Sequence, residues 1–299
     1  MRLSEAFSEY RRVEIQGRGC SLKTDENIKC AGSVACQFFG DINVKRITAA
    51  GVSDFYLDLT SNICRNTGKA RIVSQNTARG YVMTLRAVIR FCYKRGLKTI
   101  NPSEIIVPKR EKKKARYIEI EQYEALLKEV STSRKGYAKI NRVRNTLIVK
   151  MLFHTGLRVG ELCALNRDSI YNREFSVIGK SKEPRPCFIT REIEKDIKEY
   201  LDLRGDDNPA LFIANENGER ITTGGVQRIF RLATRRIGLV KVTPHTMRHS
   251  FATMLINDGV DIRYVADLLG HQDLNTTKQY THIKDCKLRK IYENLMESC

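Results

Sequence analysis

The sequence predicts a mostly α-helical protein with a small antiparallel β-sheet, divided into a helical N-terminal domain and an α+β C-terminal domain. Apolar residues recur at helical spacing through most of the chain, and short β-type runs lie between Ser169 and Thr190. Between the two domains, six of the nine residues from Pro108 to Arg116 are basic. This segment has no apolar periodicity, which is typical of a solvated linker. We therefore predict domains at residues 1–108 and 117–299, joined by a basic linker at 109–116.

In the first domain, apolar spacing predicts helices near residues 22–39, 48–64 and 74–95. The third of these is the most clearly amphipathic. One of its faces carries Tyr81, Leu85, Val88 and Cys92. The opposite face carries Arg79, Arg86, Arg90 and Lys94. This basic stripe either faces a polyanion such as DNA or is only a solvated surface, and the composition of the domain and linker favours DNA.

In the second domain, Ile120–Val130 is amphipathic, and Arg144–His154 is apolar enough to be a buried helix. Phe175–Ile178 and Cys187–Ile189 flank the charged segment Gly179–Pro184, which predicts a β-hairpin. Further helices are expected near residues 191–203, 222–236, 245–257 and 261–269.

The net charge of +19 favours a polyanionic partner, because neutralised phosphates release condensed counterions. The nine cysteines are scattered and form no C-x-x-C pair, so neither a disulfide framework nor a zinc finger is expected. No apolar run is long enough for a membrane helix, and the N-terminus has no apolar signal region. We therefore expect a cytoplasmic protein that binds nucleic acid and makes no membrane contact.

A potential phosphate site lies at the start of the helix near 245–257. Thr243 and Pro244 form a helix-start signal, and His245, Arg248 and His249 then share one helical face. The free N–H groups and dipole of a helix N-terminus already favour an anion there. The two histidines also have zinc-ligand spacing, but no cysteine or acid completes such a site, so no metal is expected.

Three further residues have the chemistry to act with this site. Arg158 follows Gly156 at a junction between two helices, where its guanidinium group could bind an anion. His271 follows Gly270, which is expected to cap the helix Ile262–Leu269. Tyr280 is a potential nucleophile if cationic neighbours favour its ionised form.

Together these motifs resemble the tyrosine recombinases, also called the phage integrase family. The resemblance rests on TGLRVGEL around Arg158, the H-x-x-R-H of His245–His249, LLGH ending at His271, and Tyr280 nine residues later. It covers the chain from about residue 117 to its end, whereas the first 110 residues are similar to the family's core-binding domain only in size, helicity and charge. Without a separate arm-binding domain, the chain looks most like the compact Xer-type or simple integrase members.

The resemblance implies that Tyr280 attacks DNA to form a 3′-phosphotyrosyl link, while Arg158 and Arg248 stabilise the developing charge. It implies that His245 assists proton transfer and that His271 hydrogen-bonds the phosphate. A hairpin lysine would be the general acid, and Lys180 fits better than Lys182. Lys112, Lys113 and Lys114 of the linker are expected, with the basic stripe, to contact DNA.

Family resemblance also implies that no cofactor is needed and that a homo-tetramer acts on DNA. The apolar spacing of the segment Lys287–Met296 suits docking into a neighbouring protomer or onto its own domain. Two other functions remain open, a type IB topoisomerase and a non-cleaving DNA-binding protein of the same fold. The sequence does not specify the target site, the accessory proteins, or the choice among integration, dimer resolution and inversion.

Overall fold

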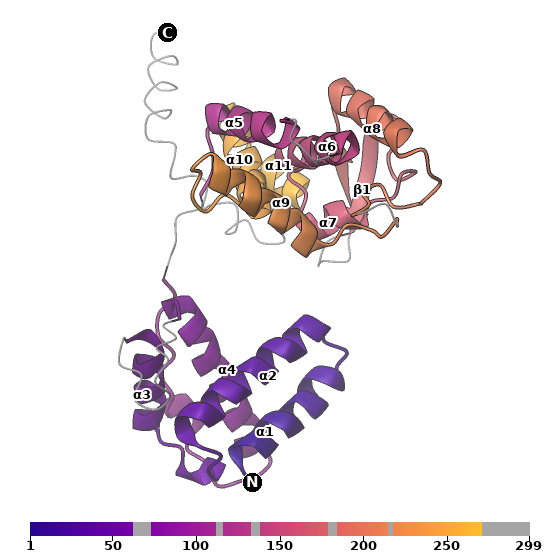
Figure 1. Cartoon of the computed structure of the whole chain (residues 1–299). Helices are drawn as coiled ribbons and strands as arrows, with labels where there is room; N and C mark the ends of the chain where they lie inside the picture. The colour runs from indigo at the N-terminus through magenta and orange to yellow at the C-terminus, as the bar shows by residue number, and fades with distance from the viewer. Residues whose placement is uncertain (62–72, 112–115, 133–137, 179–183, 215–217, 271–299) are drawn as a thin grey trace, which may run out of the picture. The chain divides into compact units, whose positions relative to one another are not determined.

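The computed structural model describes residues 1–61, 73–111, 116–132, 138–178, 184–214 and 218–270. The chain divides into two compact units, residues 1–113 and 114–299, each with its own hydrophobic core (Figure 1). Described residues are predominantly helical, with one two-stranded antiparallel sheet in the second unit. This confirms the predicted fold class.

The first unit is built from helices alone within its described residues. They are α1 (Leu3–Tyr10), the π-helical turn η1 (Arg11–Gln16), α2 (Leu22–Phe39), the 3-10 turn η2 (Val44–Arg46), α3 (Ala49–Thr60), α4 (Gln75–Lys94) and the 3-10 turn η3 (Pro102–Glu104). Helix α4 packs against α1, α2 and α3 (Figure 1). Its apolar face is buried as predicted, because Leu85, Val88 and Cys92 are fully covered and Tyr81 packs against the same core.

The sequence reading missed α1, which begins three residues into the chain. Leu3, Ala6 and Phe7 have helical spacing but form too short a pattern to predict a helix alone. These side chains are buried against the rest of the unit, so tertiary packing stabilises the helix. Close packing is evident at Gly32 of α2, where an added Cβ would lie 2.9 Å from the Phe7 ring.

The predicted basic stripe of α4 is divided in the structure. Arg79 Nε donates to Pro108 O (2.9 Å) and Arg86 Nε donates to Pro102 O (2.8 Å), so these half-buried side chains hold the segment that follows α4. Arg90 and Lys94 are exposed. The first residues of the predicted linker are also held, since Asn76 and Glu111 exchange two hydrogen bonds of 3.1 Å.

The second unit combines helices with the hairpin. Its elements are α5 (Ile120–Ser131), α6 (Lys139–Thr155), α7 (Val159–Ala164), β1 (Glu174–Ile178), β2 (Pro184–Phe188), α8 (Arg191–Arg204), α9 (Thr223–Arg236), α10 (Pro244–Asn257) and α11 (Ile262–Leu269). Helix α6 contacts α5, α7, α8 and α10, and it is the buried helix expected from the sequence (Figure 1). No described helix is long and apolar enough to cross a membrane.

The predicted hairpin is present, but its second strand begins earlier than expected. Pro184, which the sequence reading assigned to the turn, is the first residue of β2 and pairs with Ile178, while Pro186 pairs with Ser176. Prolines two residues apart are tolerated because alternate residues of an edge strand point their N–H positions away from the partner strand. Arg185 and Cys187 are then the inward-facing residues of β2.

Core packing in the first unit can be tested at Phe55 of α3. This ring is completely buried and lies 5.3 Å from Phe38 and 5.5 Å from Phe39, between ring centroids. We expect Phe55→Ala to lower the free energy of unfolding by about 3–5 kcal/mol through loss of burial and formation of a cavity. Urea-induced unfolding measures this change.

Leu57 provides the matched control, because it lies on the same helix and is 58% exposed. Leu57→Ala should change the free energy of unfolding by less than about 1 kcal/mol. Equal effects of the two substitutions would show that α3 does not pack as described.

Candidate active site

The N-terminus of α10 presents the predicted histidine and arginine motif. Thr243 is the N-cap, its hydroxyl accepts from the Thr246 N–H (3.3 Å), and Pro244 occupies the first turn. These residues fix where the helix begins, because the side chain satisfies an otherwise unpaired N–H and proline suits the first helical position. The start fixes the directions of all later side chains, and Met247 and Phe251 consequently enter the core.

Arg248 is the most deeply buried charged residue of this motif, with only 2% of its surface exposed. Its Nη1 donates to Gly156 O (2.7 Å) and its Nη2 donates to Leu269 O. Gly156 ends α6 and Leu269 ends α11, so one guanidinium group connects the termini of two helices to α10. Main-chain carbonyls at helix C-termini are suited to this role because they lack helical partners and carry partial negative charge.

Arg158 is brought to the same place by a sharp turn between α6 and α7. Gly156 ends α6 with a left-handed φ of 62°, and an added Cβ there would lie 2.5 Å from Phe251 Cδ1. Arg158 is the N-cap of α7, and its backbone N–H donates to Glu161 Oε2 (2.8 Å). Its side chain reaches Glu161 Oε1 from Nη1 (2.7 Å) and Gly270 O from Nη2 (3.3 Å).

A third arginine, which the sequence reading assigned no role, completes the arrangement. Arg185 enters from β2 with 7% of its side chain exposed. Successive carbonyls at the end of α11 each accept from a different arginine: Leu268 O from Arg185 Nε (2.9 Å), Leu269 O from Arg248 Nη2, and Gly270 O from Arg158 Nη2. The end of α11 is thus held by β2, α10 and the α7 N-cap together.

Glu161 is the acidic partner within this group. Burial alone would raise its pKa, but hydrogen bonds from Arg185 and from the side chain and backbone of Arg158 outweigh burial, so the pKa is lowered. The carboxylate is therefore ionised at neutral pH. One feature of the sequence could have indicated the role of Glu161, because it lies three residues after the N-cap Arg158, which is the position of the glutamate in a capping box.

The two histidines of α10 are held in their neutral forms. Desolvation by the surrounding protein, and then the positive charges of Arg248 and Arg158, lower the pKa of His245, although the residue itself is exposed. The pKa of His249 is lowered to about 4, by burial and then by His245 and Arg248. The rings meet edge to face with centroids 4.6 Å apart. A neutral imidazole can accept a proton, which suits His245 to proton transfer.

Among the predicted site residues, Arg158, His245 and Arg248 are therefore brought together. Lys180, the alternative Lys182, His271, Tyr280, and the linker residues Lys112, Lys113 and Lys114 lie outside the described residues. Gly270 caps α11 with a φ of 61°, as predicted, and His271 follows it in sequence. The described part of the chain contains no group of three or more His, Cys, Asp or Glu residues that could hold a metal.

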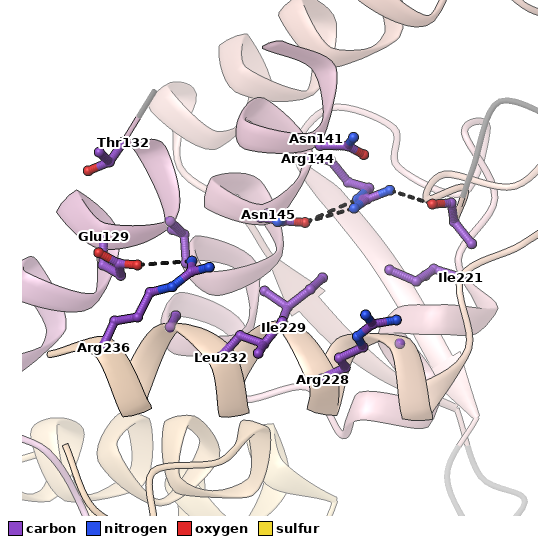
Figure 2. A pocket seen from close by; sticks show the side chains of 14 residues that line it. Glu129, Thr132, Asn141, Arg144, Asn145, Ile221, Arg228, Ile229, Leu232 and Arg236 are labelled. Carbon is purple, nitrogen blue, oxygen red and sulfur yellow. Dashed lines mark hydrogen bonds and ion pairs between the residues drawn. The ribbon is translucent and has the colours of Figure 1, made fainter. Parts of the chain in front are cut away.

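Helix α9 carries a basic face that the sequence reading also missed. Arg228, Arg231 and Arg235 have spacing i, i+3 and i+7, and all three are exposed. A pocket of about 530 Å³ lies between α9, α5 and α6, and Arg228 of the basic face is one of its lining residues (Figure 2). Within the pocket Arg236 pairs with Glu129 (3.3 Å) and Arg144 donates to Ala214 O (2.9 Å), and no predicted site residue is among the described residues that line it.

The lowered pKa of His249 predicts a pH-dependent stability. The unfolded chain binds a proton at His249 near pH 6.5, whereas the folded chain does so only near pH 4. The contribution to stability is therefore complete above pH 6.5 and is lost as the pH falls toward 4, by an amount on the order of 2 kcal/mol. We expect His249→Gln to reduce the loss of unfolding free energy between pH 7 and pH 4.5.

Urea unfolding of both proteins across this pH range measures the difference. Carboxylates and the remaining histidines affect both curves, so the comparison isolates His249. Parallel curves would mean that His249 is not kept neutral in the folded protein.

Comparisons with known proteins identify the family. The model of the phage integrase family matches residues 116–286. A tyrosine recombinase XerC of Staphylococcus aureus is 33% identical over 244 residues, covering 79% of this chain and 77% of that protein. Among solved structures, a XerA recombinase is 28% identical, with a TM-score of 0.51, covering 98% of this chain and 97% of its own.

More distant structures support the fold. A lambda integrase dimer bound to a core site has a TM-score of 0.75 at 19% identity, covering 94% of this chain and 95% of its own. The Tn1549 transposon integrase in complex with transposon right-end DNA has a TM-score of 0.74 at 18% identity, covering 94% of each chain. With its arginine and histidine motifs gathered at one place and a family match over more than half its length, the chain belongs to the phage integrase family of tyrosine recombinases.

Proposed function

We propose that the protein is a site-specific DNA recombinase that cuts and rejoins strands through a 3′-phosphotyrosyl intermediate. The observation that carries this proposal is the meeting of Arg158 and Arg248 at the end of α11, beside His245 and directly before His271 in sequence. This group concentrates positive charge where a phosphodiester would gain charge in the transition state. The matched relative is itself called a tyrosine recombinase, which favours recombination over the topoisomerase and non-cleaving alternatives.

In the proposed reaction, the Tyr280 hydroxyl oxygen attacks the scissile phosphorus as its proton leaves toward His245 or solvent. The bond from phosphorus to the 5′ oxygen breaks, and Lys180 supplies the proton that the departing oxygen takes up, with Lys182 as the alternative. Arg158, Arg248 and His271 contact the non-bridging oxygens. A free 5′-hydroxyl then reverses the step on the new strand, so the bond energy is conserved and no cofactor is required.

Double-stranded DNA is the proposed partner, and the exposed basic residues are its proposed contacts. On α4 these are Arg90 and Lys94, whereas Arg79 and Arg86 have the additional role of holding the chain after α4. The basic face of α9 provides a second surface, and Lys112, Lys113 and Lys114 of the linker a third. DNA complexes of the lambda and Tn1549 integrases support this partner.

A homo-tetramer on two duplexes, joined through the segment Lys287–Met296, remains part of the proposal. That segment lies outside the described residues, so its support is the spacing of its apolar positions in the sequence. Predicted domain limits of 1–108 and 117–299 are likewise retained, with the unit boundary after residue 113 falling inside the proposed linker. The expected cytoplasmic location remains part of the proposal and is consistent with a function on DNA.

The nucleophile is tested by Tyr280→Phe. We expect wild-type protein to form a covalent adduct with a nicked duplex in the presence of EDTA, and the variant to form none, because the substitution removes the attacking oxygen. DNA affinity should change by less than about threefold, since the phenol hydroxyl is a single group among many phosphate contacts. Denaturing gels detect the adduct, and gel-shift titration measures affinity.

Duplexes from the DNA that flanks the gene provide the first substrates. An adduct formed equally by Tyr280→Phe would exclude Tyr280 as the nucleophile. Tight binding without any wild-type adduct would favour a DNA-binding protein that does not cleave.

The proposed contacts predict a change in salt dependence. We expect two double variants to weaken DNA binding, Arg90→Gln/Lys94→Gln and Arg231→Gln/Arg235→Gln. In each, the slope of log affinity against log salt concentration should decrease in magnitude by up to about two. Lys195→Gln/Lys198→Gln makes the same charge change on α8, which is rich in acidic residues, and should leave the slope unchanged. A double variant with the wild-type slope would exclude its residue pair from the interface.

A further inference from the structure

Arg185 is a buried charged residue to which the proposed reaction assigns no part. It lies between two prolines in β2, and its guanidinium group forms a bidentate pair with Glu161, through Nη1 to Oε1 (3.0 Å) and Nη2 to Oε2 (2.7 Å). Its remaining Nε bonds to Leu268 O at the end of α11. All three bonds run to elements that carry the active-site group, so Arg185 joins the hairpin to both α7 and α11.

Both carboxylate oxygens of Glu161 accept hydrogen bonds from Arg158 and from Arg185. Oε1 accepts from the side chains of Arg158 (2.7 Å) and Arg185 (3.0 Å). Oε2 accepts from the backbone N–H of Arg158 (2.8 Å) and from Arg185 (2.7 Å). The carboxylate is almost completely buried, with a side-chain exposure of 8%, so its interactions are little screened by solvent.

This sharing determines how much positive charge remains for a phosphate. With both arginines present, the group formed by Arg158, Arg185 and Glu161 has a net charge of +1. Without Arg185, the buried carboxylate would be neutralised by Arg158 alone, which would become one half of a closed ion pair. The Arg158 side chain is the more exposed of the two, at 31% against 7%, and so is the one that can also reach a ligand.

We propose that Arg185 is a positioning residue that neutralises Glu161 and thereby leaves Arg158 free to stabilise the scissile phosphate. This inference rests on the proposed function and adds a residue to it. Arg185 itself need not touch DNA. It also fixes the carbonyl end of α11, from which the chain continues to His271, and it connects that end to the hairpin that contains Lys180.

The test uses the full chain and two nicked duplexes of the same sequence. One has an ordinary scissile phosphodiester, and the other has a methylphosphonate there, which removes the negative charge that Arg158 would balance. We expect Arg185→Met to slow adduct formation on the phosphodiester by roughly tenfold to a hundredfold, less than the full loss of a transition-state donor. On the methylphosphonate the loss should be below about threefold, because the missing charge is no longer needed.

A double variant restores the charge without restoring the arginine. In Glu161→Gln/Arg185→Met, the carboxylate and its partner are both removed, and the local net charge returns to +1 through Arg158. This protein should cleave the phosphodiester at least about fivefold faster than Arg185→Met, since one buried ionic interaction is worth this much or more. Arg185→Lys, which keeps the charge, should also exceed Arg185→Met.

Arg204 provides the structural control. Its side chain is completely buried, pairs with Asp206 (2.5 Å) and donates to the carbonyls of Ala210 (2.6 Å) and Leu211 (2.9 Å), so it resembles Arg185 in chemistry without contacting Glu161. Arg204→Met should lose activity by the same factor on both duplexes, whatever its effect on stability. Thermal unfolding of each variant establishes that it is folded.

The outcomes separate this inference from the proposed function. Failure of the wild-type protein to form an adduct would contradict both. With an active wild type, the inference is overturned if Arg185→Met loses the same factor on the two duplexes, or if the double variant is no faster than Arg185→Met. Should Arg185→Met not fold, the same comparison of duplexes is made with Arg185→Gln, which also removes the charge and for which a larger loss on the phosphodiester is again expected.

Discussion

The second unit depends on the binding of three guanidinium groups to the C-terminal end of α11. Burial of an arginine costs several kcal/mol unless its N–H groups find acceptors, and the last carbonyls of a helix are acceptors without helical partners. Here the arginines gain acceptors and the unpaired carbonyls gain donors, because Arg158, Arg185 and Arg248 donate hydrogen bonds to three successive carbonyls. The α7 N-cap, β2, α10 and α11 must therefore assemble together.

The same interaction produces the chemistry of the site. Three arginines and one ionised glutamate leave an excess of positive charge in this group. Desolvation by the surrounding protein, and then the charges of Arg248 and Arg158, lower the pKa of His245. Neutral imidazoles beside cationic groups suit a reaction in which a proton moves while a phosphate gains charge. The bonds that hold the helices in place thus also set the electrostatics of the proposed active site.

Local signals in the sequence were reliable where backbone chemistry decides the structure. Thr243 and Pro244 start α10 and Gly270 ends α11 as predicted, since capping and left-handed glycine geometry depend on neighbouring residues. Secondary structure was predicted less well where it depends on packing between residues distant in the sequence. Helix α1 is stabilised by burial of its short apolar face, and Pro184 enters β2 because an edge strand tolerates it.

From the sequence by itself came the fold class, the family resemblance and the proposal of Arg158, His245 and Arg248 as site residues, because these follow from residue type and spacing. Tertiary structure alone decided that Arg185 belongs to the same group, and that Arg79 and Arg86 hold the chain beyond α4. Partners such as Glu161 and Arg185 lie 24 positions apart, and no local pattern connects them. Only folding brings such charges within hydrogen-bonding distance of each other, and they must then pair because an unpaired buried charge is energetically costly.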